Sequence, residues 1–299
     1  MSLKVKNISK EFYSNTFFDK KIKNVLKDVS FDLKADDIFG ITGPNGAGKT
    51  TLFKIILDLI EPSKGKVNIA DSKNKYLAYI NTNVRSFYWR LTPRDNLIFY
   101  GRLLNMNSDE IGKNINDLSK KFDVIDLLET PFMKLSSGQM QTFIIIRSLL
   151  KKPDFLFFDE ATSSMDFQRS IKVLNIIKDY INENQIPSVW CSHNLDEIEF
   201  LCNRFSILKK GDLQILTKDE FKELKYQASM YCFEILKKDL AKLPKHLKYK
   251  LVSDFKNTHL ICFQDETKSL NDTVKILIKN NIKIHEIVNR KNMRDFSFE

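Results

Sequence analysis

The sequence is poor in cysteine, and its few cysteines have no metal-binding or redox spacing. They form no CxxC pair, and no histidine stands at metal-ligand spacing from them. Disulfide frameworks belong to short secreted chains, whereas this chain has 299 residues. We therefore expect reduced thiols in a cytoplasmic protein. The cysteines are Cys191, Cys202, Cys232 and Cys262.

Long hydrophobic runs and blocks of like charge are also absent. The longest apolar runs, such as FIII and FLFF, are far shorter than the ~20 residues of a spanning helix. MSLKVKNISKEFY has no apolar segment of the signal-peptide kind. No five like charges occur together, so the net charge of +10 is dispersed. This favours a solvated lysine-rich surface, with nucleic acid or anionic lipid as alternatives.

Short apolar and alternating stretches separated by helical patterns predict an α/β domain over residues 1–218. A helical subdomain is expected at about 92–150. The predicted strands are LKVKNIS, VSFDLK, DIFGIT, KVNI, YLAYI, FLFFDE, SVWCS, RFSIL and LQIL. Residues 219–299 show a strand-helix-strand-strand-helix-strand order, which predicts a small α+β, ferredoxin-like domain. We expect this second domain to be accessory, either regulatory or dimer-stabilising.

The stretch GPNGAGKT fits the phosphate-loop pattern GxxxxGK[ST], between an apolar strand and a helix. Its glycines let backbone N–H groups point at a phosphate, and the helix N-terminus adds positive potential. Lys49 is predicted to reach the β- and γ-phosphates, and Thr50 to bind Mg²⁺. The predicted nucleotide-binding residues are Gly43, Pro44, Asn45, Gly46, Ala47, Gly48, Lys49, Thr50 and Thr51.

Two carboxylates end the apolar stretch FLFFDE, where loops meet ligand in a parallel sheet. Asp159 is predicted to hold Mg²⁺ together with Thr50. Glu160 is predicted to orient and deprotonate the attacking water. The alternative is that Glu160 is an ordinary solvated carboxylate at the end of a strand.

A second anion-gripping loop, KLSSGQMQ, lies between the phosphate loop and FLFFDE. It is followed by SSMD at residues 163–166 and by His193 after SVWCS. This ordered set, from about residue 2 to about residue 215, resembles the ATP-binding cassette (ABC) family. The resemblance implies a P-loop ATPase domain with a mixed sheet and a helical arm. It also implies that two cassettes pair head to tail, with the signature of one, residues 135–139, facing the phosphate loop of the other.

The resemblance implies further roles, each with an alternative. Lys49, Glu160 and His193 are the expected catalytic residues, His193 bonding the γ-phosphate unless it is structural. Asp166 is expected to signal across the dimer, or else only to cap the next helix. Phe12 is expected to stack on adenine, with Tyr13 or a core role for Phe12 as the alternatives. The signature residues expected to contact the partner's ATP, rather than only to cap a helix, are Ser136, Ser137, Gly138 and Gln139.

The sequence departs from the family pattern at three positions. Ser137 replaces a glycine of the signature, Thr142 stands where a basic residue is common, and Thr82 takes the place of a glutamine near the metal. Between these positions, RSFYWRLT resembles cassettes of ABC-2 type exporters. Its aromatic residues 87–89 either dock a helix of a membrane subunit or pack inside the arm.

The sequence therefore predicts the ATP-binding and ATP-hydrolysing subunit of an ABC transporter, of the exporter kind. It would use ATP and Mg²⁺, pair with a second cassette as a homodimer, and drive integral membrane permease subunits. Its expected place is cytoplasmic, peripheral on the inner face of the cell membrane, without nucleic acid. The alternative is a soluble ABC-type ATPase acting on ribosomes or nucleic acid, and a non-hydrolysing ATP-dependent scaffold is a third possibility.

Overall fold

A computed structural model of the chain describes residues 2–16, 19–70, 75–228, 231–244, 249–254, 256–263 and 270–289. The chain divides into two compact units, residues 1–218 and residues 219–299. Within the described residues, no helix combines the length and the hydrophobicity that crossing a membrane requires.

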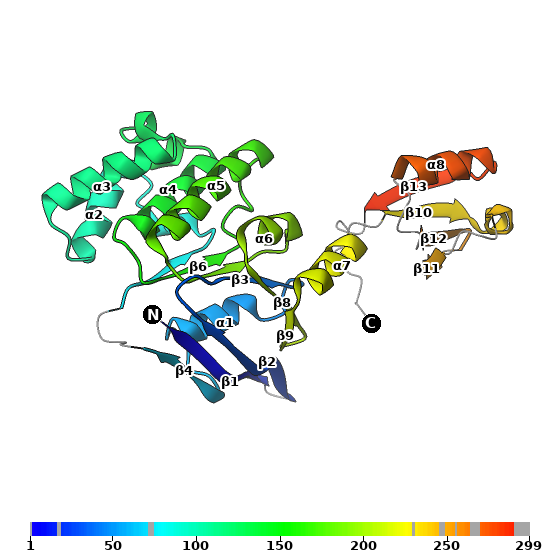
Figure 1. The fold of residues 1–299 in the computed structure, drawn as a ribbon, viewed down its shortest axis with the longest axis horizontal. Coiled ribbons are helices and arrows are strands. Elements are labelled where there is room, and N and C mark those ends of the chain that lie inside the picture. Colours follow the sequence, from blue (N-terminus) through cyan, green and yellow to red (C-terminus); the bar gives the residue numbers. More distant parts are fainter. Residues whose placement is uncertain are drawn as a thin grey trace. The chain divides into compact units, whose positions relative to one another are not determined.

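A six-stranded sheet forms the centre of the first unit (Figure 1). Its order is β5 (Leu77–Ile80), β6 (Phe155–Asp159), β7 (Ser188–Cys191), β3 (Ile38–Thr42), β8 (Arg204–Lys209) and β9 (Asp212–Leu216). The first five strands are parallel, and β9 runs antiparallel to β8. The sheet is therefore mixed, as predicted. Strands β3, β6 and β7 are buried along their whole length, which explains their unbroken apolar sequences.

A second, antiparallel sheet consists of β2 (Asp19–Leu33), β1 (Leu3–Thr16) and β4 (Lys64–Ile69). Helix α1 (Lys49–Ile56) lies between this sheet and the six-stranded sheet (Figure 1). Apolar side chains of α1 pack in one core with residues of β1, β2, β3, β6, β7 and β8. The helix that follows the phosphate loop is therefore fixed from both sides.

Helices α4 (Ser137–Leu149), α5 (Phe167–Asn184) and α6 (Leu195–Leu201) lie on the opposite face of the six-stranded sheet from α1 (Figure 1). The helical arm contains α2 (Pro93–Leu103), α3 (Ser108–Lys121) and α4, with three short 3₁₀ segments. Those segments are η1 (Val84–Ser86), η2 (Ile125–Leu127) and η3 (Phe132–Lys134). Thr92 and Asp95 form a reciprocal capping box at the start of α2.

The second unit is built around a four-stranded antiparallel sheet with the order β11-β12-β10-β13. Helix α7 (Lys218–Ala228) precedes β10 (Tyr231–Leu236), η4 (Lys237–Lys242), β11 (Tyr249–Asp254), β12 (Thr258–Phe263), α8 (Leu270–Lys279) and β13 (Ile284–Asn289). This order is the predicted ferredoxin-like order, except that a 3₁₀ segment stands where the first helix was expected. Its core includes Phe233, Ile235, Ile261 and Leu277.

The cysteines depart in part from the expectation of reduced thiols. Cys191 and Cys202 are free and buried, and burial raises the pKa of both thiols. Cys232, however, is disulfide-bonded. The expectation is therefore wrong for Cys232, whose register partner on the neighbouring strand β12 is Cys262. Sequence spacing did not reveal this relation, because the two residues are brought opposite each other only by strand pairing.

Candidate functional site

The phosphate loop follows β3 and closes around the side chain of Lys49. A Cβ on Gly43 would lie 2.1 Å from the carbonyl oxygen of Leu208, so only glycine allows this approach of loop and strand β8. The Lys49 side chain is 7% exposed. Its ammonium group donates to the carbonyl oxygens of Gly43 at 2.6 Å and Pro44 at 3.2 Å. The loop thus encloses a fixed positive charge.

The N-terminus of α1 is open to a ligand. Its N-cap, Gly48, has a left-handed backbone with φ of 112°, provides no side-chain cap, and no acidic residue follows in the first turn. By contrast, α2, α4 and α5 are capped by the side chains of Thr92, Ser136 and Asp166. Uncapped N–H groups at a helix start favour an anion. The tip of the loop, residues 44–46, is exposed, whereas Ala47 is buried and Thr51 is half-buried.

Oxygen donors meet beside the loop at the Asp159 carboxylate. Its Oδ2 accepts a hydrogen bond from the hydroxyl of Thr50 at 2.7 Å and from that of Tyr79 at 2.9 Å. Burial is the main cause that raises the pKa of Tyr79, so this phenol stays protonated and donates. A carboxylate beside a threonine hydroxyl, next to a phosphate loop, fits a hard divalent cation such as Mg²⁺. Asp159 and Thr50 are the residues that would hold it.

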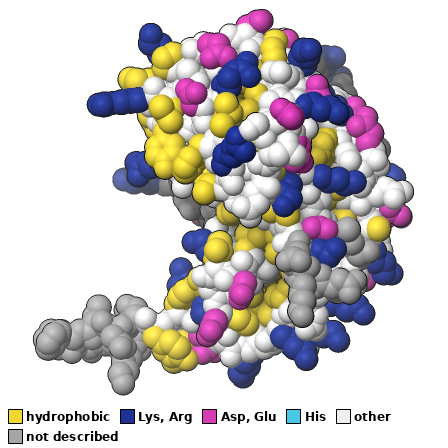
Figure 2. Space-filling view, turned by 90° about the vertical axis from the view of Figure 1, so that its left-hand side faces the viewer, with side chains coloured by type: hydrophobic (Ala, Val, Ile, Leu, Met, Phe, Trp, Pro, Cys, Tyr) yellow, Lys and Arg dark blue, Asp and Glu magenta, His cyan; other side chains and the backbone are white. Residues whose placement is uncertain are grey.

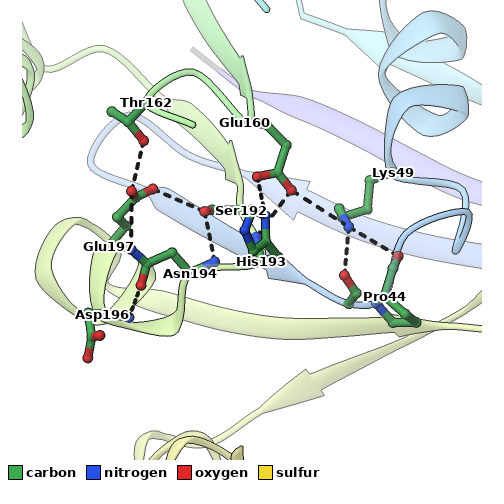
Figure 3. A network of polar contacts seen from close by, with 10 residues as sticks. Pro44, Lys49, Glu160, Thr162, Ser192, His193, Asn194, Asp196 and Glu197 are labelled. Carbon is green, nitrogen blue, oxygen red and sulfur yellow. Dashed lines mark hydrogen bonds and ion pairs between the residues drawn. The ribbon is translucent and has the colours of Figure 1, made fainter. Parts of the chain in front are cut away.

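Glu160 is turned toward Lys49 and His193 by an unusual backbone (Figure 3). Its φ is 55°, the left-handed region, which costs a non-glycine residue about 1–2 kcal/mol. The carboxylate accepts from the His193 backbone N–H at 3.2 Å and lies 2.6 Å from its Nδ1. Its Oε1 is 4.0 Å from the Lys49 ammonium. The surrounding structure holds this strained geometry, which is a common feature of functional sites.

The Glu160 contact leads to a prediction for the titration of His193. The hydrogen bond from Glu160 raises the pKa of His193 above 6.5, although burial acts in the opposite direction. The charged pair therefore stabilises the fold below pH 6.5, and this contribution is lost as pH rises through the folded-state pKa. NMR titration, with His193→Asn to assign the signal, should show a raised pKa that moves back toward 6.5 in Glu160→Gln. A wild-type value at or below 6.5 would contradict the contact.

A buried carboxylate that the sequence analysis missed lies behind His193 (Figure 3). Glu197 accepts hydrogen bonds from Thr162 at 2.8 Å, Ser192 at 3.0 Å and Asn194 at 3.3 Å. It thereby joins the loop after β6 to the loop after β7, which carries His193. In the sequence Glu197 is one of several acids on a short helix, so nothing marks it as different from its neighbours.

Polar contacts bring together Lys49, Thr50, Asp159, Glu160 and His193, but these contacts do not extend to the signature residues. Among the described residues, no hydrogen bond or ion pair joins residues 43–50 to residues 135–139. The Ser136 hydroxyl accepts from the backbone N–H of Gln139, whose side chain in turn accepts from the N–H of Ser136. Because this hydroxyl acts only as an acceptor here, its proton remains available to a ligand.

The other predicted residues lie as follows. Asp166 caps α5 through its Oδ1, which accepts from the N–H of Arg169 at 2.9 Å. Phe12 is 43% exposed, which excludes a core role, and the Lys10 ammonium lies 5.2 Å from its ring centre. Tyr13 is exposed as well, so both aromatic residues are accessible to a base. Thr82 is exposed, and no hydrogen bond of its side chain to a described residue is seen.

A half-buried tyrosine and a buried glutamine make contacts near Thr82, the position where the family usually has a glutamine. Tyr79 reaches the Asp159 carboxylate from β5. Gln141, fully buried on α4, donates to the carbonyl oxygen of Asn81 at 3.0 Å. The arm therefore contacts the loop after β5 through a side chain of its own, Gln141.

Residues 26–163 match the protein family described as ABC transporter. The chain is 32% identical over 213 residues to the ABC transporter ATP-binding protein NatA of Bacillus subtilis, covering 67% of this chain and 85% of that protein. The chain belongs to the ABC transporter family. It is an ABC-type ATPase.

A second relative of this ABC-type ATPase is named as an import protein, and a solved cassette has a similar fold. It is 31% identical over 218 residues to the molybdate/tungstate import ATP-binding protein WtpC of Pyrococcus abyssi, covering 71% of this chain and 60% of that protein. Its fold matches that of a cassette solved as a dimeric post-hydrolysis state with ADP and Pi, with a TM-score of 0.62 and 23% identity. That match covers 72% of this chain and 99% of the solved chain.

Proposed function

We propose that this ABC-type ATPase is the ATP-hydrolysing subunit of an exporter and drives separate membrane subunits. The observation that carries the proposal is the convergence of Lys49, Glu160 and His193 beside the Thr50–Asp159 pair. The phosphate loop and the start of α1 bind the phosphates of ATP, and Phe12 stacks on its adenine. Residues 1–218 form the ATP-binding domain, and residues 219–299 form an accessory domain.

Each residue has a chemical task in hydrolysis. Glu160 accepts a proton from the water that attacks the γ-phosphorus, and the bond to the β-phosphate oxygen breaks, giving ADP and phosphate. Lys49 and His193 donate to the γ-phosphate as charge builds on it. When bound at Thr50 and Asp159, Mg²⁺ neutralises charge on the phosphate oxygens.

The signature segment acts on the ATP of a second copy of the chain. The Ser136 hydroxyl keeps a free proton. Its cap of α4 uses the N–H of Gln139, so the N–H of Gly138 in the same turn can still face an anion, which the helix dipole favours. These residues share no polar contact with residues 43–50 of their own chain, which supports a mate as the source of the nucleotide. Asp166, at the start of the next helix, signals across the same dimer interface.

The arm presents an apolar surface that suits a helix of a membrane subunit. Tyr88 and Trp89 are 53% and 45% exposed, and the ring of Phe99 lies 5.3 Å from that of Tyr88. Phe87 instead stacks on Phe132 at 4.4 Å inside the arm, so it does not dock. Other exposed apolar residues of the arm region are Leu91, Ile98, Leu103 and Met133.

The distribution of charge supports a protein partner over nucleic acid. Figure 2 shows Lys and Arg interspersed with Asp and Glu on the face that includes the arm, and a cluster of hydrophobic side chains on its upper part, with others lower down. On this face, the mixture of charges lacks the basic stripe that nucleic acid needs. Docking to a permease places the ATPase in the cytoplasm, on the inner face of the membrane.

Co-purification tests the proposal. The chain should be recovered with a multi-helix membrane protein encoded beside it, and Trp89→Asp should abolish the recovery while ATP hydrolysis continues. Ile215→Asp, at an exposed apolar residue of β9, is the matched control and should leave recovery unchanged. Recovery with ribosomes in high salt would contradict the proposal, and recovery of a membrane protein irrespective of Trp89 would remove the aromatic surface from its docking role.

A further inference from the structure

A hydrogen bond joins the first turn of α4 to the loop after β6. It is made by Ser137, where the sequence departs from the family pattern. Ser137, which replaces a signature glycine, donates its hydroxyl to the carbonyl oxygen of Ser164 at 3.2 Å. A glycine has no hydroxyl to offer. The signature segment is therefore joined, within one chain, to the SSMD segment at residues 163–166.

The second departure, Thr142, makes a contact with the same region. Its buried hydroxyl donates to the carbonyl oxygen of Gly138 at 2.8 Å and accepts from Nε and Nη2 of Arg169 at 3.3 and 3.2 Å. The backbone N–H of Arg169 is held by Asp166. A basic side chain at position 142 would repel the guanidinium, whereas the threonine hydroxyl accepts from it.

The joint between the two segments is closely packed. A Cβ on Gly138 would lie 3.3 Å from Cδ of Arg169 and 3.7 Å from Cα of Met165. The aliphatic part of Arg169 therefore covers the glycine at the start of α4. Hydrogen bonds on both sides of this contact, at Ser137 and at Thr142, leave the two segments little freedom to move separately.

We propose that Ser137, Thr142 and Arg169 are positioning residues that hold the signature segment and residues 163–166 as one rigid unit. This inference rests on the proposed function, in which Ser136 and Asp166 both face the mate. Held together, the two residues meet the partner's nucleotide in one preformed arrangement, so less ordering is needed when the dimer closes. The unit is built from this chain's own departures at positions 137 and 142.

Two substitutions at one site test the unit. Thr142→Val keeps the branched shape and removes the hydroxyl, whereas Thr142→Ser keeps the hydroxyl. Thr142→Val should lower kcat roughly tenfold, the scale of one hydrogen bond to a charged group, with KM for ATP unchanged because Lys49 is untouched. Thr142→Ser should restore kcat. Arg169→Met should act like Thr142→Val, and the double variant should add little.

Hydrogen exchange of the nucleotide-free chain provides a readout that does not depend on turnover. Amides of residues 135–142 should exchange roughly tenfold faster in Thr142→Val and in Ser137→Gly. Ser148→Ala is the matched control, because among the described residues the Ser148 hydroxyl makes only the equivalent intrahelical bond, to the carbonyl oxygen of Ile144 at 3.1 Å, and the change should alter neither readout. Ser137 is exposed, so Ser137→Gly should fold.

The outcomes separate this inference from the proposed function. Wild-type exchange rates in both Ser137→Gly and Thr142→Val would overturn the rigid unit, whatever the ATPase rate. An equal loss of kcat in Ser148→Ala would overturn it too, because the intrahelical bond would then account for the effect. If the wild-type chain fails to pair with ATP while the exchange rates change as expected, the proposed trans site fails and the unit itself stands.

Discussion

Glu160→Gln should bind ATP, accumulate as a dimer and hydrolyse ATP at least about 100-fold more slowly, the scale of losing a general base. Glutamine has nearly the shape of glutamate and can still accept from the His193 N–H, so the left-handed turn at residue 160 is kept. It cannot take the proton of the attacking water. ATP binding depends on Lys49 and the phosphate loop, which the substitution leaves in place.

The measurements are phosphate release, nucleotide binding and size-exclusion chromatography with and without ATP-Mg²⁺. Glu183→Gln is the matched control, because Glu183 is a surface carboxylate on α5 paired with Lys121 at 3.0 Å, and all three measurements should match the wild type. Unchanged turnover in Glu160→Gln would remove Glu160 from its role. Slow turnover without a dimer would support Glu160 as the general base, but it would contradict the role of ATP in holding two chains together.

The elements of the ATPase fold could be predicted because their signals are local. The unbroken apolar strands β3, β6 and β7 and the glycine loop before α1 are readable within short windows. The spatial order is not local, since β3 pairs with β7 and β8, whereas its sequence neighbours β2 and β4 belong to the other sheet. Helix boundaries are less readable, because Asn107 and Ser108 are both capping residue types and only the structure shows that Asn107 caps α3, its side chain accepting from the N–H of Glu110.

The parts of the candidate site that the sequence missed depend on strand pairing and on side-chain orientation. Tyr79 reaches Asp159 because β5 pairs with β6 in a register that sets Tyr79 opposite Phe157, two residues before the carboxylate. Glu197 matters because its carboxylate points inward to Thr162 and Ser192. Neither relation can be read from spacing along the chain.

In the arm, too, the sequence alone did not show which aromatic side chains are buried and which are exposed. The aromatic residues 87–89 were predicted either to dock a partner or to fill the arm, and the structure divides them. Phe87 is 3% exposed and lies under the Arg147 guanidinium at 5.2 Å, whereas Tyr88 and Trp89 face outward. A run of three aromatic residues carries no periodicity that could separate these two environments.

Mixing two inactive variants should restore ATP hydrolysis if the nucleotide is shared between chains. Lys49→Ala removes the ammonium group that binds phosphate, and loss of such a group costs about 100- to 1,000-fold. Ser136→Asp keeps an efficient helix cap but sets a carboxylate against the partner's γ-phosphate. Ser136→Asn caps equally well without the charge and should lose far less activity, so the comparison isolates repulsion from misfolding.

Each variant alone carries its defect in both sites of a symmetric dimer. A mixed dimer gathers both defects in one site and leaves the other intact, so an equal mixture should recover roughly a quarter of wild-type turnover. The same mixing of Lys49→Ala with Glu160→Gln should recover nothing, because the two groups lie 4.0 Å apart in one chain and belong to the same half of a site. Recovery in both mixtures would point to contamination with an active ATPase. If neither mixture recovers activity, Ser136 does not act on the ATP bound by a second chain, and the head-to-tail arrangement is wrong.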